Sequence, residues 1–215
     1  MKQYFEIADV TAREIASSGG EQTVEVEVTL DDSTVGRASV PGGMDNAKSA
    51  NVAVDNINIE IAEALIAMDA LSQPSIDKIL LDLDGTENGS RLGANALMAV
   101  SVACAKAAGE SAGLALYNYI GGVNAKTIPP LTDEKSNICL SSFPTLTALL
   151  DAVSEEQKAG KKIVISAGSS ETDDSFLADL AVAVNADAIV SKSLAVSNQL
   201  LRIEEELFDV PVYPE

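Results

Sequence analysis

The residues best suited to bind an anion lie around one strand–turn–helix segment, residues 163–186. Residues 163–165 form a continuous β-branched run, as expected of a strand covered on both faces. Residues 170–174 supply N-cap oxygens and acidic charge where a helix begins. In α/β proteins, ligands bind at the turn that follows the carboxyl end of a strand. Ser169 in this turn and Lys192 near the end of the next predicted strand are therefore the two candidates for anion binding.

The rest of this turn offers little chemistry. Ala167 and Gly168 stand at the strand end and supply no base, no metal ligand and no anion clamp. Asp173 and Asp174 precede the helix, and their charge opposes a bound anion. The chain contains no histidine, which excludes His-based triads, His–metal sites and imidazole acid–base catalysis. These residues predict no catalytic group, no metal site and no cofactor.

Charge and composition limit the classes of partner. The formal net charge is −19, and the longest basic run is Lys161–Lys162. Such a surface repels nucleic acid and anionic membranes, so we expect neither as a partner. With 47% hydrophobic residues but only 4% aromatic ones, the core must be built from small and aliphatic side chains.

The cysteines and the apolar segments indicate a cytoplasmic protein. Cys104 and Cys139 cannot form the disulfide framework of a small secreted domain, and both are expected to be packed thiols. Residues 1–6 lack the apolar core of a signal peptide. The most apolar stretch, residues 92–108, is interrupted by polar residues and is too rich in small side chains to span a bilayer.

Periodicity divides the chain into two parts. Strict alternation of polar and apolar residues over 23–30 predicts a half-buried antiparallel strand, within a meander that also includes 4–16 and 34–40. A helical period then follows, and the predicted helices are residues 47–68, a helix opening at 72–75, 92–109 and 114–120. This order predicts an α+β domain over residues 1–122, ending at the glycine pair 121–122.

The second part, residues 123–215, alternates strands with helices. After a polar, proline-containing stretch to about residue 136, the predicted strands are 137–143, 162–167 and 188–192. The predicted helices are 145–159, 174–185 and 197–207. Three sequential strand–helix units favour parallel strands, and hence an α/β region smaller than a barrel.

Three stretches of the sequence resemble the enolase family. The residues at 10–15 and 23–28 are similar to the enolase opening. The run LDGTENGSRLGANALMAVSVACAKAAG and the later LYNYIGG resemble a long helical part of its N-terminal domain. The runs SSETDDSFLADLAVAVNA and NQLLRIEEEL resemble the last part of its barrel. The resemblance implies an enolase-like N-terminal domain followed by only three of the eight barrel units, because 93 residues follow Gly122 whereas such barrels take about 250.

The resemblance also implies that the catalytic groups are missing. Enolases have a lysine base on the strand that corresponds to 137–143, where this sequence has Cys139, Ser141 and Ser142. The family's histidine and phosphate-binding arginine correspond to Ala167 and Gly168. The family's magnesium-binding carboxylates lie on strands for which the chain has no counterpart.

Other positions depart from the family pattern less decisively. The family's substrate-binding lysine at the end of the last strand has no direct match, and Lys192 lies two positions later. The mobile N-terminal loop appears as residues 42–46 without its serines. The acidic run 204–206 is either a solvated helix face or, because this region lies near the enolase dimer contact, part of an interface.

Two functions stay open. One is an enolase-derived interaction, assembly or regulatory protein without catalysis, whose protein partner the sequence does not name. The other is an enolase-type lyase that converts 2-phosphoglycerate to phosphoenolpyruvate with Mg²⁺ and needs residues from a complementing chain.

A half-barrel would also expose its former interior, with apolar side chains such as Ile138, Val164 or Ile165, depending on the strand register. The N-terminal domain or a second copy of the chain can cover it. We expect a homodimer with the half-barrel sheet or its flanking helices at the interface, because enolases are dimers.

Overall fold

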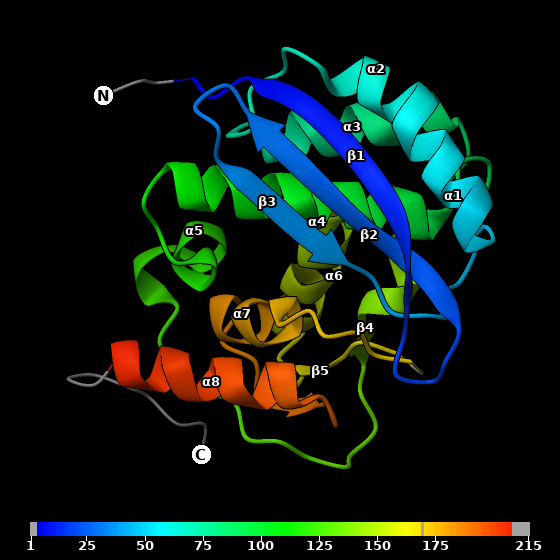
Figure 1. Ribbon diagram of the computed structural model, residues 1–215. Coiled ribbons are helices and arrows are strands. Elements are labelled where there is room, and N and C mark those ends of the chain that lie inside the picture. Colours follow the sequence, from blue (N-terminus) through cyan, green and yellow to red (C-terminus); the bar gives the residue numbers. More distant parts are fainter. Residues whose placement is uncertain (1–3, 169, 208–215) are drawn as a thin grey trace.

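The amino-terminal half is built on an antiparallel sheet, in a computed structural model that describes residues 4–168 and 170–207 (Figure 1). Its strands are β1 (Ile7–Ala16), β2 (Gln22–Leu30) and β3 (Val35–Ser39), in the order β1-β2-β3. Alternation along β2 places valines on one face, and these side chains are fully buried against the helices. The predicted meander is confirmed.

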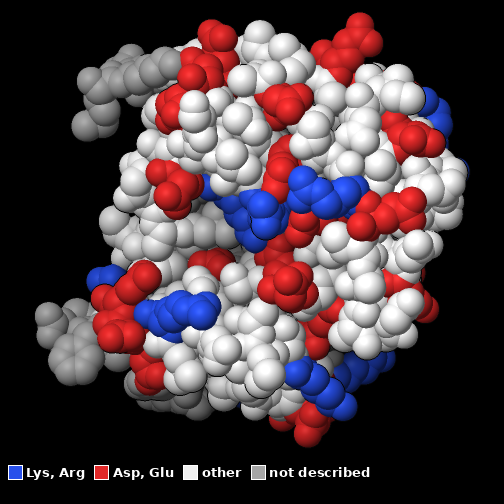
Figure 2. Space-filling model, viewed as in Figure 1, with Lys and Arg blue, Asp and Glu red and all other residues white. Residues whose placement is uncertain are grey.

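The opposite face of this sheet carries a ladder of paired charges. Arg13 on β1 contacts Glu25 at 2.6 Å and Glu27 at 2.7 Å, and Arg37 on β3 contacts Glu27 at 2.5 Å. Acidic and basic side chains consequently interleave across β1–β3 (Figure 2). Hydrogen bonds from Arg13 lower the pKa of Glu27 to about 2.

The predicted helix over 47–68 is continuous but irregular. It consists of α1 (Ala50–Asn56), a π-helical turn (Ile57–Ile61) and α2 (Ala62–Leu65). Asn58 in the π turn pairs with the edge of the sheet: its Oδ1 accepts from the Ala12 amide at 2.7 Å, and its Nδ2 donates to the Ala12 carbonyl at 3.3 Å. This side chain blocks strand pairing at the outer edge of β1.

Three further helices complete this half: α3 (Gln73–Asp84), α4 (Ala94–Ser111) and α5 (Leu116–Gly121). The alanine-rich α4 lies directly under the sheet. A side chain at Gly36 of β3 would place its Cβ 2.2 Å from the Ala103 carbonyl oxygen, so β3 and α4 approach closely only because this residue is glycine. Within residues 4–168 and 170–207, no helix is long and apolar enough to cross a membrane.

The second half has three parallel strands alternating with helices. A short 3₁₀ turn (Gly122–Asn124) leads toward β4 (Ile138–Cys139), and a second one (Leu140–Ser142) follows that strand. The order then continues as α6 (Leu146–Lys158), β5 (Val164–Ser166), α7 (Phe176–Ala183), β6 (Ala188–Val190) and α8 (Leu194–Glu206). The strands pair in parallel in the order β4-β5-β6, which confirms the partial α/β region.

Among the boundaries that differ from the sequence prediction, two have an identifiable local cause. The strand predicted over 137–143 ends at Cys139, because Asp45 of the amino-terminal half binds the carbonyl of Ser141 and the hydroxyl of Ser142 and holds them in a turn. The last helix begins three residues earlier than predicted. Ser193 caps it by accepting a hydrogen bond from the Ala195 amide at 3.2 Å.

A fourth extended segment joins the parallel sheet. Ile189 of β6 donates its amide to the Pro130 carbonyl at 3.0 Å and accepts from the Thr132 amide at 2.9 Å. Leu131 therefore pairs in parallel with Ile189 along the outer edge of β6. The sequence analysis described this proline-containing stretch only as a connection.

The register shows which side chains share a face. Ile138, Ile165 and Ile189 are aligned across the three strands and lie in the hydrophobic core, against α6 and α7. Val164 and Ala188 are aligned on the opposite face, and both are buried there. Of the three side chains named for the face away from the helices, Val164 lies there, whereas the register turns Ile138 and Ile165 toward α6 and α7.

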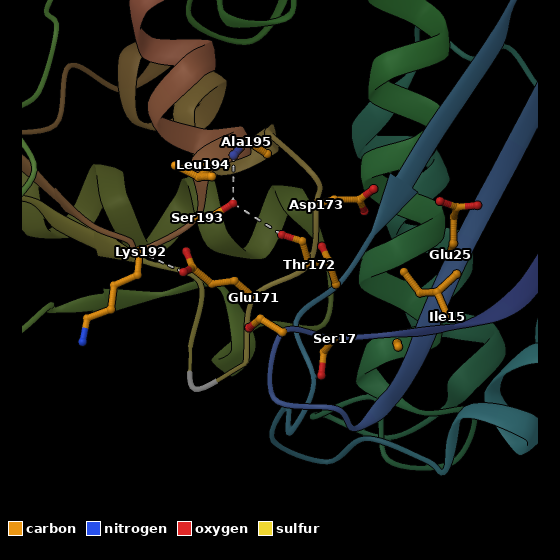
Figure 3. Close-up of a pocket in the computed structure, with 12 residues that line it drawn as sticks. Ile15, Ser17, Glu25, Glu171, Thr172, Asp173, Lys192, Ser193, Leu194 and Ala195 are labelled. Atoms are coloured by element: carbon orange, nitrogen blue, oxygen red, sulfur yellow. Dashed lines mark hydrogen bonds between the residues drawn. The ribbon is translucent and has the colours of Figure 1, made fainter.

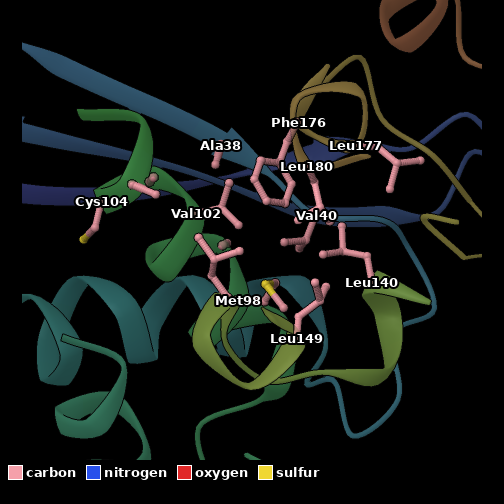
Figure 4. Packing of buried hydrophobic residues seen from close by; sticks show 14 of the residues in the cluster. Ala38, Val40, Met98, Val102, Cys104, Leu140, Leu149, Phe176, Leu177 and Leu180 are labelled. Carbon is pink, nitrogen blue, oxygen red and sulfur yellow. The ribbon is translucent and has the colours of Figure 1, made fainter. Parts of the chain in front are cut away.

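One hydrophobic core runs through both halves. Val40, Met98 and Val102 from the first half pack with Leu140, Leu149, Phe176, Leu177 and Leu180 from the second (Figure 4). The boundary predicted at residues 122–123 thus lies between two parts that share a core, and it stays a prediction.

A buried carboxylate also joins the halves. Asp77 on α3 accepts hydrogen bonds from Ser101 on α4 at 2.6 Å and from the amide and hydroxyl of Thr147 on α6 at 2.8 and 2.6 Å. Its side chain is 1% exposed. Because the Thr147 amide lies in the first turn of α6, Asp77 satisfies a helix end that would otherwise lack an acceptor.

Replacing Asp77 with alanine should lower the free energy of unfolding by about 3 kcal/mol, since several buried donors lose their acceptor. Urea unfolding measures the difference. The matched control is Asp82→Ala on the exposed side of the same helix, which should change stability by less than about 0.5 kcal/mol. Equal effects of the two substitutions would show that Asp77 does not join the halves.

Candidate functional site

The carboxyl ends of the parallel strands are covered by the amino-terminal half. Ser170 follows β5, and its hydroxyl lies 2.9 Å from that of Ser17 and accepts from the Gly19 amide at 3.1 Å. Its carbonyl accepts from the Gly42 amide at 2.8 Å, and the Glu171 carbonyl accepts from the Ser18 amide at 2.7 Å. The β1–β2 turn and the loop after β3 therefore bind directly to the turn after β5, the position at which α/β proteins bind ligands.

The loop over residues 42–46 also binds the end of β4. The Asp45 amide donates to the Ser141 carbonyl at 3.0 Å, and the Asp45 carboxylate accepts from the Ser142 hydroxyl at 3.0 Å. A Cβ at Gly42 would lie 2.9 Å from the Glu21 carboxylate and 3.3 Å from Ser170. This close packing restricts movement of the loop away from the strand ends.

Asp174 occupies the amides at the start of α7. One of its carboxylate oxygens accepts from the Phe176 amide at 2.8 Å and contacts the Lys106 ammonium at 2.6 Å. The other accepts from the Ser39 amide at 2.7 Å. The side chain of Asp174 is 8% exposed, so the positive end of α7 already holds a buried internal anion.

Glu171 occupies the next turn in the same way. Its carboxylate accepts from the Ser191 hydroxyl and from the Lys192 amide, at 2.5 and 2.9 Å. These contacts tie the loop after β5 to the loop after β6. Two protein carboxylates thus fill the positions where strand-end amides and hydroxyls would receive a ligand anion.

The two anion-binding candidates have different outcomes. Ser169 lies outside the residues that the structure describes. Lys192 is exposed, and its side chain extends away from the Glu171 carboxylate (Figure 3). Both stay predictions as ligand-binding residues.

The open space near the strand ends is acidic. A cavity of 20 Å³ lies between Leu140, Ala167 and Phe176, and a pocket of 300 Å³ lies at the ends of β5 and β6, where Gly168 and Ser191 line it together with Asp133 and Glu171. A larger cleft of 680 Å³ lies beside it, between the β1–β2 turn and the start of α8 (Figure 3). Its charged lining residues are Glu25, Glu171, Asp173 and Lys192. Glu25 and Glu171 already have partners, and one lysine beside three carboxylates does not form a cationic cradle.

The two cysteines add no reactive group that the structure identifies. Cys104 is fully buried in α4, and burial raises the pKa of its thiol well above the usual range, so it stays protonated. Cys139 is half-buried, and its sulfur lies 3.0 Å from the Ser141 hydroxyl. Sequence analysis placed both as packed thiols, and the structure confirms this for Cys104.

Sequence analysis missed the role of Lys106. It noted the residue only as a charge that interrupts an apolar stretch, whereas the structure pairs it with Asp174, 68 positions later. A lysine in a helix that is otherwise almost entirely buried was the available signal, because such a charge needs a partner.

We expect inorganic phosphate to give no saturable increase in melting temperature, and Lys192→Ala to behave like the parent chain in the same titration. Glu171 and Asp174 already hold the amides that an anion would need. Sodium chloride at matched ionic strength is the control. A saturable increase with phosphate that is lost in Lys192→Ala would establish the predicted anion site.

Two protein-family profiles match the chain. Residues 7–120 match the enolase N-terminal domain, and residues 132–214 match the enolase C-terminal TIM barrel domain. The first match covers more than half of the chain and contains the sheet β1–β3 with helices α1–α5. The second covers 83 residues (214 − 132 + 1), against about 250 for a complete barrel. The chain therefore belongs to the enolase family, as a truncated member with a partial barrel.

Proposed function

We propose that this enolase-family protein is not a catalyst and acts as an interaction or assembly protein. The observation that carries the proposal is that polar groups at the strand ends already have hydrogen-bond partners within the protein. Glu171 and Asp174 accept hydrogen bonds from backbone amides there, and Ser170 binds the amino-terminal half. An active site needs polar groups that are free to bind a substrate. Here these groups stabilise the fold.

The chemistry of the family supports the same proposal. Sites of the enolase superfamily use a lysine or histidine base together with one or two Mg²⁺ ions, which stabilise a doubly negative intermediate. At the strand ends this chain has Cys139 and Ser141 where the resemblance implies a lysine, and Ala167 and Gly168 where it implies a histidine and an arginine. Ala167 and Gly168 carry no acid–base group, and neither Cys139 nor Ser141 supplies the positive charge of the lysine that the resemblance implies.

The residues present do not fit Mg²⁺. This ion requires octahedral oxygen coordination, usually with one or two free carboxylates. Two carboxylates close to the strand ends, Glu171 and Asp174, are both bound to protein donors. In residues 4–168 and 170–207, no group of three or more His, Cys, Asp or Glu side chains is arranged to hold a metal ion.

Self-association is the assembly we propose. Leu194 and Leu201 on α8 and Leu131 on the neighbouring edge segment are 78%, 62% and 49% exposed. A groove of 500 Å³ between them is lined by Ile128, two prolines and Leu200. Exposed apolar patches of this kind mark interfaces, and prolines at 129 and 130 disfavour open-ended strand pairing. We therefore propose a homodimer through α8, one of the helices flanking the sheet.

A cytoplasmic location belongs to the same proposal. Both cysteines are free thiols, as is usual in reducing compartments.

We expect no conversion of 2-phosphoglycerate with excess magnesium. The reason is the simultaneous loss of the base, the phosphate clamp and the metal ligands. Absorbance of phosphoenolpyruvate provides the assay, with a full-length enolase as the positive control. Turnover within about a thousandfold of an ordinary kcat of ~10 s⁻¹ would overturn the proposal and favour the lyase.

Light scattering at micromolar concentration should give twice the chain mass of 22.3 kDa. Leu201→Glu should reduce the mass to that of the monomer, because a charge in an apolar interface is costly. The control, Ile59→Glu, changes an equally exposed residue in the amino-terminal half, 70% accessible, and should leave the dimer intact. A monomeric parent chain would refute the homodimer.

A further inference from the structure

A second cavity lies apart from the strand ends, where both halves of the chain meet. Its volume is 560 Å³, and it is lined by residues of β3, α4, α5, α7 and α8, which surround one region in Figure 1. It shares no lining residue with the cleft of Figure 3. Its function therefore does not depend on the former strand-end site.

A nearly buried carboxylate lines this cavity, and Lys106, the nearby cation that lowers its pKa, is bound to Asp174. Asp179 on α7 is 4% exposed. Its Oδ1 accepts one long hydrogen bond, from the Gln199 side chain at 3.3 Å, and within the described part of the chain its Oδ2 has no hydrogen-bond partner. Burial raises the pKa of Asp179 to about 6, so the carboxylate is mostly ionised at pH 7. A bound cation stabilises an ionised carboxylate that is buried in this way.

The basic groups that border the cavity are already committed. Lys106 contacts Asp174 at 2.6 Å, and Arg37 contacts Glu27 at 2.5 Å. Glu110 on α4 and Glu206 on α8 line the same space; Glu206 accepts only a 3.3 Å hydrogen bond from Tyr117. The cavity thus combines one deep carboxylate with two at its rim, whereas Lys106 and Arg37, the cations in its lining, each form an ion pair with a carboxylate outside it.

The rest of the lining favours an organic cation over a metal ion. Val35, Leu114 and Leu116 contribute apolar surface beside the carboxylates. The described residues include no cluster of three metal-ligating side chains, as a hard divalent ion requires. An aliphatic chain with terminal ammonium groups places methylenes on these apolar residues and charge on the carboxylates.

We propose that this cavity binds an aliphatic di- or polyamine, with one ammonium group on Asp179 and another on Glu110 or Glu206. The bond to Asp179 adds a charge-assisted hydrogen bond to a carboxylate that otherwise accepts one long hydrogen bond, from Gln199. Because the cavity lies between β3, α4, α7 and α8, the bound ligand bridges the two halves of the chain.

Isothermal titration calorimetry of the full chain with putrescine and spermidine tests the proposal. We expect saturable binding that Asp179→Asn weakens by about tenfold or more, as loss of a charge-assisted hydrogen bond does. The control is Glu205→Gln, an exposed residue of α8 that does not line the cavity, and it should bind like the parent. Magnesium chloride at matched ionic strength should not reproduce the heat.

The same titration at lower pH separates a specific site from surface charge. Binding should weaken between pH 7.5 and pH 5 in the parent, because Asp179 gains a proton, and Asp179→Asn should lack most of this dependence. Lys106, Glu110, Asp174, Glu206 and Arg37 also face this region, and they are unchanged in that variant.

The stability of the variant must be known before its binding is compared with that of the parent. Asp179→Asn should melt no lower than the parent at pH 7, because it removes a buried charge; if it fails to fold, Glu110→Gln with Glu206→Gln replaces it and should also weaken binding. No saturable heat, equal binding by parent and variants, or equal heat from magnesium would each overturn the proposal.

Discussion

The arrangement of this protein depends on the buried carboxylate of Asp174. It receives an amide from β3, an amide from the start of α7 and the ammonium group of Lys106 on α4. A carboxylate that is 8% exposed is tolerated only because these donors compensate its charge. Removing any one donor would weaken that compensation, so the residue constrains the positions of all three elements.

This constraint also explains why the region resembles an active site in placement but not in chemistry. The carboxyl ends of parallel strands collect amides and hydroxyls that need acceptors. In an enzyme, substrate and metal supply these partners. In this chain Asp174, Glu171 and Ser170 supply them, and the β1–β2 turn completes the seal. The same polar groups can either stabilise the fold or bind a ligand, and in this chain they form bonds that stabilise the fold.

The partial barrel solves a second problem in a similar way. Three strands cannot close, and an uncovered parallel sheet would expose apolar surface. The register turns the isoleucines of β4, β5 and β6 toward α6 and α7 and leaves smaller side chains on the other face. The segment around Leu131 covers the outer edge of β6. The apolar surface that does stay exposed belongs to α8 and this edge segment.

Much of this architecture could be predicted from local patterns. The alternation over 23–30 predicts β2 almost to the residue, and the helical periods predict α3, α4 and α5, because side-chain periodicity reports local geometry directly. The shortened β4 and the strand-like pairing of Leu131 could not be predicted, because contacts with Asp45 and Ile189 from distant segments impose them.

The candidate site was predictable only in part. The absence of a base at Ala167 and Gly168 is visible in the sequence, and so is the acidic helix start. The partners of Asp174 and the weak pairing of Asp179 are not, because each depends on residues that only the folded chain brings together. Burial of charge is a tertiary property, and no local pattern records it.

Amide hydrogen exchange at Ser18, Ser39 and Gly42 tests the central claim most directly. Each of these amides donates to the segment that follows β5: to Glu171, Asp174 and Ser170, at 2.7, 2.7 and 2.8 Å. If the amino-terminal half seals the strand ends, all three amides should exchange slowly and open together, with an opening free energy close to that of global unfolding. Exchange at the rate of unprotected amides in the native protein would show that the strand ends are open, and would contradict the account.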